Sequence, residues 1–433
     1  MADDASPRSF GEQLRAAREE AGLSLAEFAR RAHYSKGHVS KIERGRSPTL
    51  EFARQCDAVL GTAGTFAALV RDQPRTAVTA PQAMADELWV LRLSPAGTYE
   101  FGSQRSGDVI ATGIMSWTAD PRRLHVESAT GAVQAYRVIF DQLRLLGQTA
   151  GPAELVPSLV AATTALRGIA TRAEAPLRSK ALLLAARFAE YAGWMAQEKG
   201  DERAAHWWTD RAVELASDGD DKELMAYASV RRALIALYRH DAEDTIALAQ
   251  RAQHGCDHPR ILGLALQREA QGHAIAGNEL ACRNLLERAA GLLATAKATG
   301  LGSAPLLGSS ALDDPVVMST GWCLHELGNS REAAAVLEPA LARIPESALR
   351  ARARYGARLA LALASVRELE HACAVLEPML DTLPVLDSAT IRTDIASLTR
   401  TLSRWRSQPN VRETLRRLHI ALHASSIHSV SVG

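Results

Sequence analysis

The sequence predicts an all-α protein in which a short unit of five helices precedes a long array of paired helices. Hydrophobic residues make up 47% of the chain but aromatic residues only 5%, and Ala, Leu and Arg dominate. This composition is typical of closely packed helices rather than of a β-sandwich. Apolar side chains recur at helical spacing in residues 10–71, and a pattern of small residues repeats between about residues 181 and 384.

The chain of 433 residues is too long for one ordinary domain, so two or three domains are expected. Its formal net charge is +1, and bulk charge therefore does not by itself indicate a polyanionic partner. No signal peptide opens the chain, and no run approaches the ~18–20 apolar residues that a membrane span needs. We therefore expect a soluble, cytoplasmic protein with no membrane partner.

Residues 1–71 are expected to form the first domain, with a first helix over residues 10–22. Ser24 begins the second helix and forms a capping box with Glu27, in which each side chain satisfies an orphan backbone N–H. Phe28 then opens an apolar stripe at helical spacing. Two further helices follow over residues 50–60 and 66–70, after a turn that contains glycine and proline.

The third helix carries the strongest functional signal. Ser35 begins it, Val39 and Ile42 are its buried positions, and Gly45 ends it where a left-handed residue is favoured. The positions expected to face outward are short or basic: Lys36, Gly37, His38, Ser40 and Lys41. A helix that lies in the DNA major groove needs such a face. A generic basic surface helix is the alternative, but caps, buried positions, stop glycine and charge agree on DNA binding.

Charge is unevenly distributed around this helix. Between residues 30 and 54 only Glu43 and Glu51 are acidic, and Glu43 is expected to pair with a nearby arginine rather than to read bases. His33 and Tyr34 are expected to be turn residues. The basic residues of the segment are Arg30, Arg31, Lys36, Lys41, Arg44, Arg46 and Arg54. This local excess matches what binding to a phosphate backbone requires.

Residues 72–127 are expected to connect the two helical parts. Residues 72–86 contain Pro74 and Pro81 and resemble a linker in composition. Within residues 87–118, short extended pieces over residues 88–93, 99–101 and 109–117 are separated by glycine and proline. They predict either a small β-hairpin insert or a poorly ordered connector.

Residues 128–424 are expected to form a stack of helix pairs, with a Ser- and His-rich disordered tail over residues 425–433. In one unit, Gly321 precedes the pair Gly328-Asn329, and Ala333, Ala340 and Pro345 follow at set spacing. The small residues let two antiparallel helices approach, Gly-Asn forms the turn, and Pro ends the second helix. The corresponding turns of other units are Gly200-Asp201, His240-Asp241, Gly277-Asn278 and Arg367. Residues 128–175 and 389–423 would shield the two ends of the stack.

Two resemblances follow from these patterns. The motif Ser35-x-x-x-Val39-Ser40-x-Ile42-Glu43-x-Gly45 resembles the Cro/phage-repressor (XRE) helix-turn-helix family, which implies a lambda-repressor-like DNA-binding domain. By that resemblance, Lys36, Gly37, Ser40 and Lys41 face base edges, His38 assists, and Arg44 and Arg46 hold phosphates. Leu25 stands where many relatives have Gln or Thr, so a contact from this position to the DNA backbone is not expected. Gly37 has no side chain to read bases, so base specificity would rest mainly on Lys36, Ser40 and Lys41.

The repeat spacing resembles the tetratricopeptide repeat (TPR), which implies an α-solenoid. In that repeat the first helix of each pair lines a concave groove. The groove residues that this mapping predicts are Arg187, Tyr191, Trp194, Tyr227, Arg231, Gln267, Arg268, Gln271, Trp322, His325, Arg354 and Arg358. Aromatic side chains together with Arg and Gln can grip an extended peptide. Ordinary packing, solvated charge or a dimer face are the alternatives.

The combined architecture resembles the peptide-sensing RRNPP regulators of Gram-positive bacteria and the one-component regulators of actinomycetes. The resemblance implies a nucleoid-associated homodimer on a palindromic double-stranded DNA operator, with a sensor domain for a signalling peptide or small ligand. A DNA-tethered scaffold that binds a partner protein is the rival hypothesis.

An enzyme is not expected from this sequence. No P-loop, G-x-S-x-G or H-E-x-x-H motif is present, and no cofactor or metal is indicated. The cysteines form no C-x-x-C pair and are expected to be small buried hydrophobes, a redox-sensing thiol being the alternative. They are Cys56, Cys256, Cys282, Cys323 and Cys373.

Overall fold

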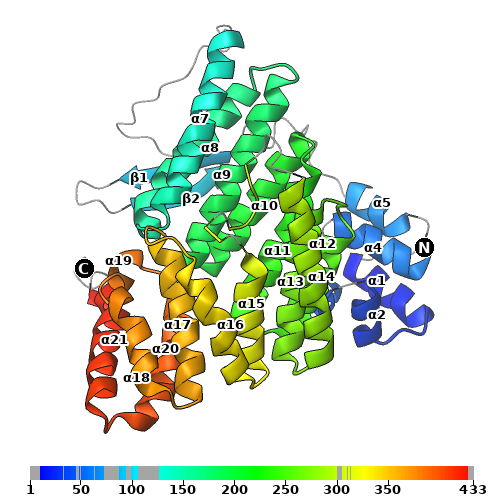
Figure 1. Cartoon of the computed structure of the whole chain (residues 1–433). Coiled ribbons are helices and arrows are strands. Elements are labelled where there is room, and N and C mark those ends of the chain that lie inside the picture. The colour runs from blue at the N-terminus through cyan, green and yellow to red at the C-terminus, as the bar shows by residue number, and fades with distance from the viewer. Residues whose placement is uncertain are drawn as a thin grey trace, which may run out of the picture. The chain divides into compact units, whose positions relative to one another are not determined.

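The computed structural model describes residues 10–72, 87–93, 99–105, 126–299 and 305–427, except residues 33, 45–47, 49, 63, 310 and 313. The fold is all-α with one added β-hairpin, as the sequence predicts. The chain divides into two compact units, Met1–Trp117 and Thr118–Gly433, which are described separately (Figure 1).

The first unit begins with the five predicted helices. They are α1 (Phe10–Glu20), α2 (Leu25–Arg31), α3 (Lys36–Glu43), α4 (Leu50–Leu60) and α5 (Thr65–Asp72). Leu14, Phe28, Val39 and Phe52 are fully buried and form the centre of one core that α1 to α4 share.

Serine caps begin α2 and α3 as predicted. The Ser24 hydroxyl accepts the Glu27 N–H at 3.2 Å, and the Ser35 hydroxyl accepts the His38 N–H at 3.1 Å. The Glu27 carboxylate, the other partner of the expected capping box, accepts a hydrogen bond from Arg31 at 2.6 Å.

The extended segment forms a β-hairpin, which decides between the two expectations for this part of the chain. Strand β1 (Glu87–Leu93) pairs antiparallel with β2 (Tyr99–Arg105), with Val90 opposite Gly102. The third extended piece, over residues 109–117, and the linker residues 73–86 lie outside the described residues.

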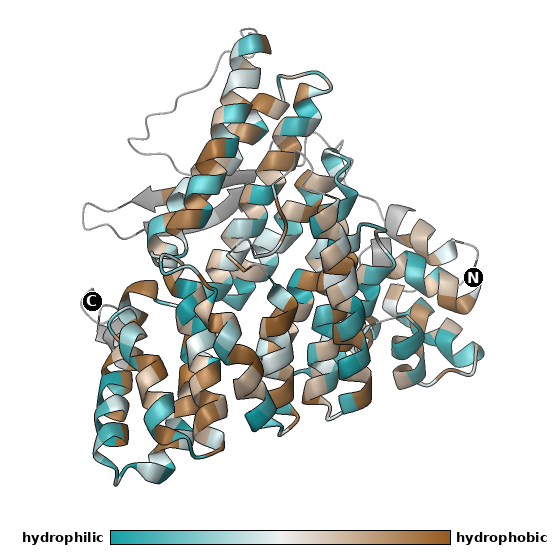
Figure 2. Cartoon of the chain, viewed as in Figure 1, coloured by the Kyte–Doolittle hydropathy of each residue, from teal (hydrophilic) through white to brown (hydrophobic). Residues whose placement is uncertain are grey.

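The second unit is a stack of antiparallel helix pairs, an α-solenoid. Figure 2 shows hydrophobic and hydrophilic residues on the same helices of this stack, as expected of helices that each bury one face. Its helices are α7 (Val126–Leu146), α8 (Pro152–Ala170), α9 (Leu177–Lys199), α10 (Glu202–Asp218), α11 (Lys222–Tyr238), α12 (Ala242–Gln253), α13 (Pro259–Ile275), α14 (Glu279–Ala298), α15 (Pro315–Glu326), α16 (Ser330–Ala342), α17 (Leu349–Ser365), α18 (Leu369–Leu376), η2 (Glu377–Met379), α19 (Leu383–Leu386), α20 (Ala389–Leu402), η3 (Ser403–Trp405) and α21 (Pro409–Ile427).

The turns within the pairs lie where the repeat pattern predicts them. Gly328 has a φ of 86°, and the degenerate turns place His240 and Arg367 in the same left-handed region, at 53° and 69°. In three of the turns the polar residue that follows caps the next helix, namely Asp201, Asp241 and Asn278. Asp201 accepts the Ala204 N–H at 2.9 Å in one such turn. The pattern therefore depends on backbone geometry that glycine adopts without strain and other residues adopt at a cost.

The first helices of successive pairs close into a ring. Contacts run from α9 to α11, α13, α15 and α17, then to α20, and α20 in turn contacts α9. The repeat pattern in the sequence predicts an open concave groove. The closure places the inner helices around a common space.

The last helix extends further than predicted. Helix α21 continues to Ile427, so the expected disordered tail at residues 425–433 begins too early. Residues 428–433 lie outside the described residues. In the part of the chain that the structure describes, none of the helices has the length and apolar character to cross a bilayer.

Gly321 tests the close packing within a pair. A Cβ at this position would collide with the Leu337 side chain across the α15–α16 interface. We expect Gly321→Ala to destabilise the protein by about 1–3 kcal/mol through overpacking, measured by thermal or urea unfolding. Gly291→Ala in α14 is the matched control, since a Cβ there meets nothing within 4 Å. That variant should be neutral or slightly more stable, and equal destabilisation by both would contradict the packing argument.

Candidate functional site

Helix α3 presents its short and basic residues to solvent. Val39 and Ile42 are buried in the core, whereas Lys36, Gly37 and Lys41 are exposed and Ser40 is partly exposed. Arg44, directly after the helix, is exposed and donates from Nε to the Ser40 carbonyl at 3.1 Å. Gly45 and Arg46 lie outside the described residues.

His38 has a different environment from the other predicted contact residues. Its ring stacks on Tyr34 with the centroids 4.9 Å apart, and it lies 5.6 Å from the Phe52 ring. Tyr34 lies in the turn between α2 and α3, as predicted, and its side chain is 8% exposed and belongs to the core. The sequence predicts that His38 faces outward. In the structure its ring packs on aromatic side chains of the core.

A buried ion pair fixes α3 against α1. Arg18 donates to both carboxylate oxygens of Glu43, at 2.7 and 3.2 Å, and also to the Leu23 carbonyl at 2.9 Å. The hydrogen bond with Glu43 raises the pKa of Arg18. The predicted structural role of Glu43 is thus confirmed. The sequence analysis did not identify its partner Arg18. The position of this arginine on the apolar face of the first helix could have indicated a buried ion pair.

The two helices also touch through their backbones. A Cβ at Gly11 in α1 would lie 2.9 Å from the Glu43 carbonyl oxygen and closer still to that of Ile42. Glycine therefore permits α1 to approach the end of α3, where the ion pair forms. Both features orient the exposed face of α3.

Basic residues that flank α3 in the sequence are also exposed. Arg30, Lys36, Lys41, Arg44 and Arg54 are exposed. The carboxylate of Glu43 is turned inward on Arg18, and its side chain is only 7% exposed. The described part of this surface can therefore pair with phosphate oxygens.

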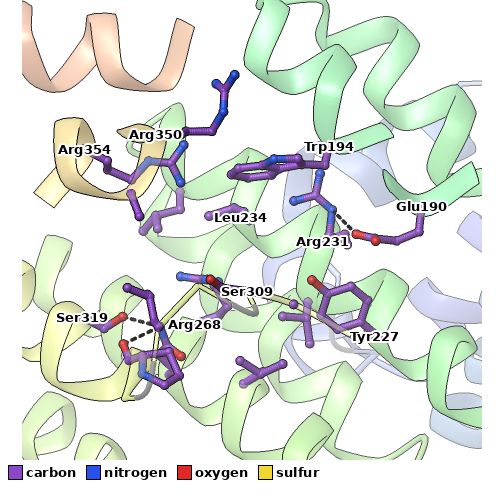
Figure 3. A pocket seen from close by; sticks show the side chains of 18 of the residues that line it. Glu190, Trp194, Tyr227, Arg231, Leu234, Arg268, Ser309, Ser319, Arg350 and Arg354 are labelled. Carbon is purple, nitrogen blue, oxygen red and sulfur yellow. Dashed lines mark hydrogen bonds and ion pairs between the residues drawn. The ribbon is translucent and has the colours of Figure 1, made fainter. Parts of the chain in front are cut away.

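A cavity lies in the second unit, on the inner side of the helix ring. Its volume is about 160 Å³, and helices α7, α9, α11, α13, α15 and α17 contribute to its wall. Figure 3 shows side chains of several of these helices around it. Most of the predicted groove residues line it: Tyr191, Trp194, Tyr227, Arg231, Gln267, Arg268, Gln271, Arg354 and Arg358.

The remaining predicted groove residues lie elsewhere. Arg187 is 1% exposed and forms an ion pair with Asp221 at 2.6 Å inside the stack. Trp322 and His325 line a separate cavity of about 380 Å³, to which Arg358 also contributes. Burial lowers the pKa of His325 in this second cavity.

Trp194 anchors one wall of the first cavity. The guanidinium carbons of Arg231 and Arg354 lie 5.2 and 4.9 Å from the indole, in cation–π geometry (Figure 3). Arg231 also lies 3.2 Å from a carboxylate oxygen of Glu190. The aromatic side chains and the arginines that the sequence predicted therefore lie in direct contact.

A segment between α14 and α15 forms another wall. The carbonyls of residues 305–309, here called the strap, accept hydrogen bonds from arginines of distant helices. Arg144 in α7 donates to Leu306 and Gly308, both at 2.5 Å. Arg260 in α13 donates to Leu307 at 2.8 Å and to Ser309 at 3.1 Å. These arginines were missed because their partners are carbonyls, which no residue pattern reveals.

Glu198 closes the ring beside this cavity. Its carboxylate is fully buried and pairs with Arg350 and Arg354 of α17, each at 2.6 Å. It also accepts hydrogen bonds from Ser388 and, at 2.8 Å, from Thr390 in α20. Burial alone would raise the pKa of Glu198, but the two arginines and the two hydroxyls lower it to about 2. The carboxylate therefore stays charged and links three helices.

No group of three or more metal-binding side chains occurs among the residues that the structure describes. Four of the five cysteines are buried, and Cys256 is partly buried. Burial raises the pKa of the Cys56 thiol, as expected for a cysteine that serves as a small hydrophobe.

Comparison with known proteins supports the assignment of the first unit. The sequence model of a family described as a helix-turn-helix domain matches residues 9–69. No curated protein and no solved structure gives a significant match. The chain thus carries a helix-turn-helix DNA-binding domain at its N-terminus, and this domain supports a role as a DNA-binding regulator.

The Arg18–Glu43 pair gives a direct test of how α3 is held. We expect Glu43→Ala to destabilise the first unit by about 3 kcal/mol, because Arg18 would remain buried without its carboxylate. Hydrogen exchange of the first unit would measure this loss. Glu27→Ala is the control, since Glu27 pairs with the exposed Arg31. Its cost should stay below about 0.5 kcal/mol, and similar costs for both variants would refute the role of the buried pair.

Proposed function

We propose that the protein is a sequence-specific transcriptional regulator of the XRE type. The observation that supports this most directly is the exposed face of α3, where Lys36, Ser40 and Lys41 surround a glycine. A short, basic helix face can enter the major groove, and lysine can donate to guanine O6 and N7. Arg44, exposed directly after the helix, would contact phosphate. No catalytic role is proposed.

The helical stack is proposed to be a degenerate TPR domain that mediates dimerisation and senses a ligand. A single α3 offers few side chains for reading bases, so two copies on a palindromic operator would supply the missing specificity. The cavity, which is lined by arginines and aromatic side chains, supports a sensory role. A ligand can shift DNA affinity only if it binds two states of the dimer differently. We place this regulator in the cytoplasm, at the nucleoid.

The two lysines of α3 carry the first test of this proposal. We expect Lys36→Ala combined with Lys41→Ala to abolish the preference for an operator selected from random DNA, while non-specific binding persists. Footprinting and competition binding would measure the preference. Lys297→Ala is the control, since Lys297 is an exposed lysine of α14 in the other unit. Unchanged footprints of the double variant would exclude α3 as the recognition helix.

Arg44 tests the division between phosphate contacts and base contacts. We expect Arg44→Ala to weaken specific and non-specific DNA binding by a similar factor, because phosphate contacts carry no sequence information. The slope of log K against log salt should become shallower by about 1 for each phosphate that the variant no longer neutralises. Titrations at several salt concentrations would measure it. A salt-independent wild-type affinity would contradict direct binding to the DNA backbone.

A further inference from the structure

The wall of the cavity holds far more positive than negative charge. The arginines that line it are Arg144, Arg231, Arg260, Arg268, Arg350, Arg354 and Arg358, whereas Glu190 is its one acidic lining residue among those described. Further carboxylates stand behind the wall. Glu198 serves both Arg350 and Arg354, and Asp394 lies 2.9 Å from Arg358. Within the described residues, guanidinium groups thus outnumber the carboxylates that contact them.

The excess is concentrated on Arg144, Arg260 and Arg268. The first two donate to carbonyls of the strap, which carry partial charges only. Arg268 donates to the amide oxygen of Gln271, and its Nε has no partner among the described residues. Burial lowers the pKa of both Arg260 and Arg268. A desolvated guanidinium without a carboxylate is unfavourable, so a bound anion would relieve this cost.

The lining offers further donors but few negative groups. Burial raises the pKa of the Tyr227 phenol to about 12, so it stays neutral near pH 7 and can donate a hydrogen bond. Trp194 provides a flat apolar surface beside the arginines (Figure 3). Guanidinium groups bind carboxylate and phosphate oxygens with paired hydrogen bonds. The cavity therefore fits an oxyanion, and several guanidiniums without a carboxylate favour one with more than a single charge.

The shape of the site distinguishes a small molecule from an extended peptide. The contact of α20 with α9 closes the ring, and the strap forms part of the cavity wall. A volume of about 160 Å³ accommodates a compact ligand. An extended peptide requires an open groove along several repeats, which this closure removes.

We propose that the cavity binds a small multivalent oxyanion, either a phosphorylated metabolite or a polycarboxylate. Arg268 provides the main guanidinium without a carboxylate, and Arg144 and Arg260 provide two more at the strap. That this ligand is the regulatory signal rests on the function proposed above. The binding itself does not depend on DNA.

Calorimetric titration of the full-length chain with inorganic pyrophosphate and with citrate, at constant ionic strength, tests the proposal. We expect saturable binding of at least one probe and a higher melting temperature in its presence. Tighter binding of pyrophosphate would point to a phosphorylated ligand, and tighter binding of citrate to a polycarboxylate. If neither probe binds, or only an acidic extended peptide does, the proposal is overturned.

Variants assign the binding to this cavity. Arg268→Gln keeps a polar side chain but removes the charge, and it should weaken binding of the probe by about tenfold or more. Arg203→Gln on the exposed surface of α10 is the matched control and should bind like the wild type. Equal affinities in all three proteins would show non-specific attraction and overturn the proposal. Arg268→Gln should not lower the melting temperature of the protein measured without probe, which separates weakened binding from misfolding.

The DNA experiment is kept separate from the anion titration. If a probe binds in the cavity but changes operator affinity under no salt condition, the sensory function fails while the anion site stands. If operator binding proceeds normally and neither anion binds, the anion site fails while the DNA-binding function stands.

Discussion

The helical stack depends on one buried carboxylate, that of Glu198. Four side chains of α17 and α20 and of the turn before α20 converge on this group of α9, and their combined effect keeps its pKa at about 2 despite complete burial. Arg350 extends the same network, because it also donates to the carbonyls of Gly147 and Ala150 between α7 and α8. Removing the Glu198 charge would leave two buried arginines without their carboxylate and would weaken the link between α9, α17 and α20.

This network holds several of the arginines that line the cavity in fixed positions. Arg350 and Arg354 are held by Glu198, and Arg231 by Glu190, so these guanidiniums have fixed directions. A fixed guanidinium loses little entropy when an anion arrives, which favours recognition by preorganisation. In the DNA-binding domain the Arg18–Glu43 pair has the equivalent role for α3. Buried ion pairs therefore support part of the cavity wall and the helix proposed to read DNA.

The sequence predicted the features that depend on residues close together in the chain. The serine caps at Ser24 and Ser35 and the left-handed turn at Gly328 each follow from a few neighbouring residues. Contacts between residues far apart in the chain could not be predicted in this way. The role of Glu198 could not be read, because its partners Arg350 and Thr390 lie 152 and 192 positions further along the chain. Periodicity identified the inner helices but not their closure into a ring.

Ring closure also constrains how this protein can evolve. Open solenoids gain or lose repeats readily, because each repeat contacts only its neighbours. Here the carboxylate of Glu198 at the start of the ring meets Thr390 at its end, so one added or deleted helix pair would draw these partners apart. We therefore expect homologous proteins to keep the number of helix pairs between α9 and α20 constant while the lengths of their outer turns vary.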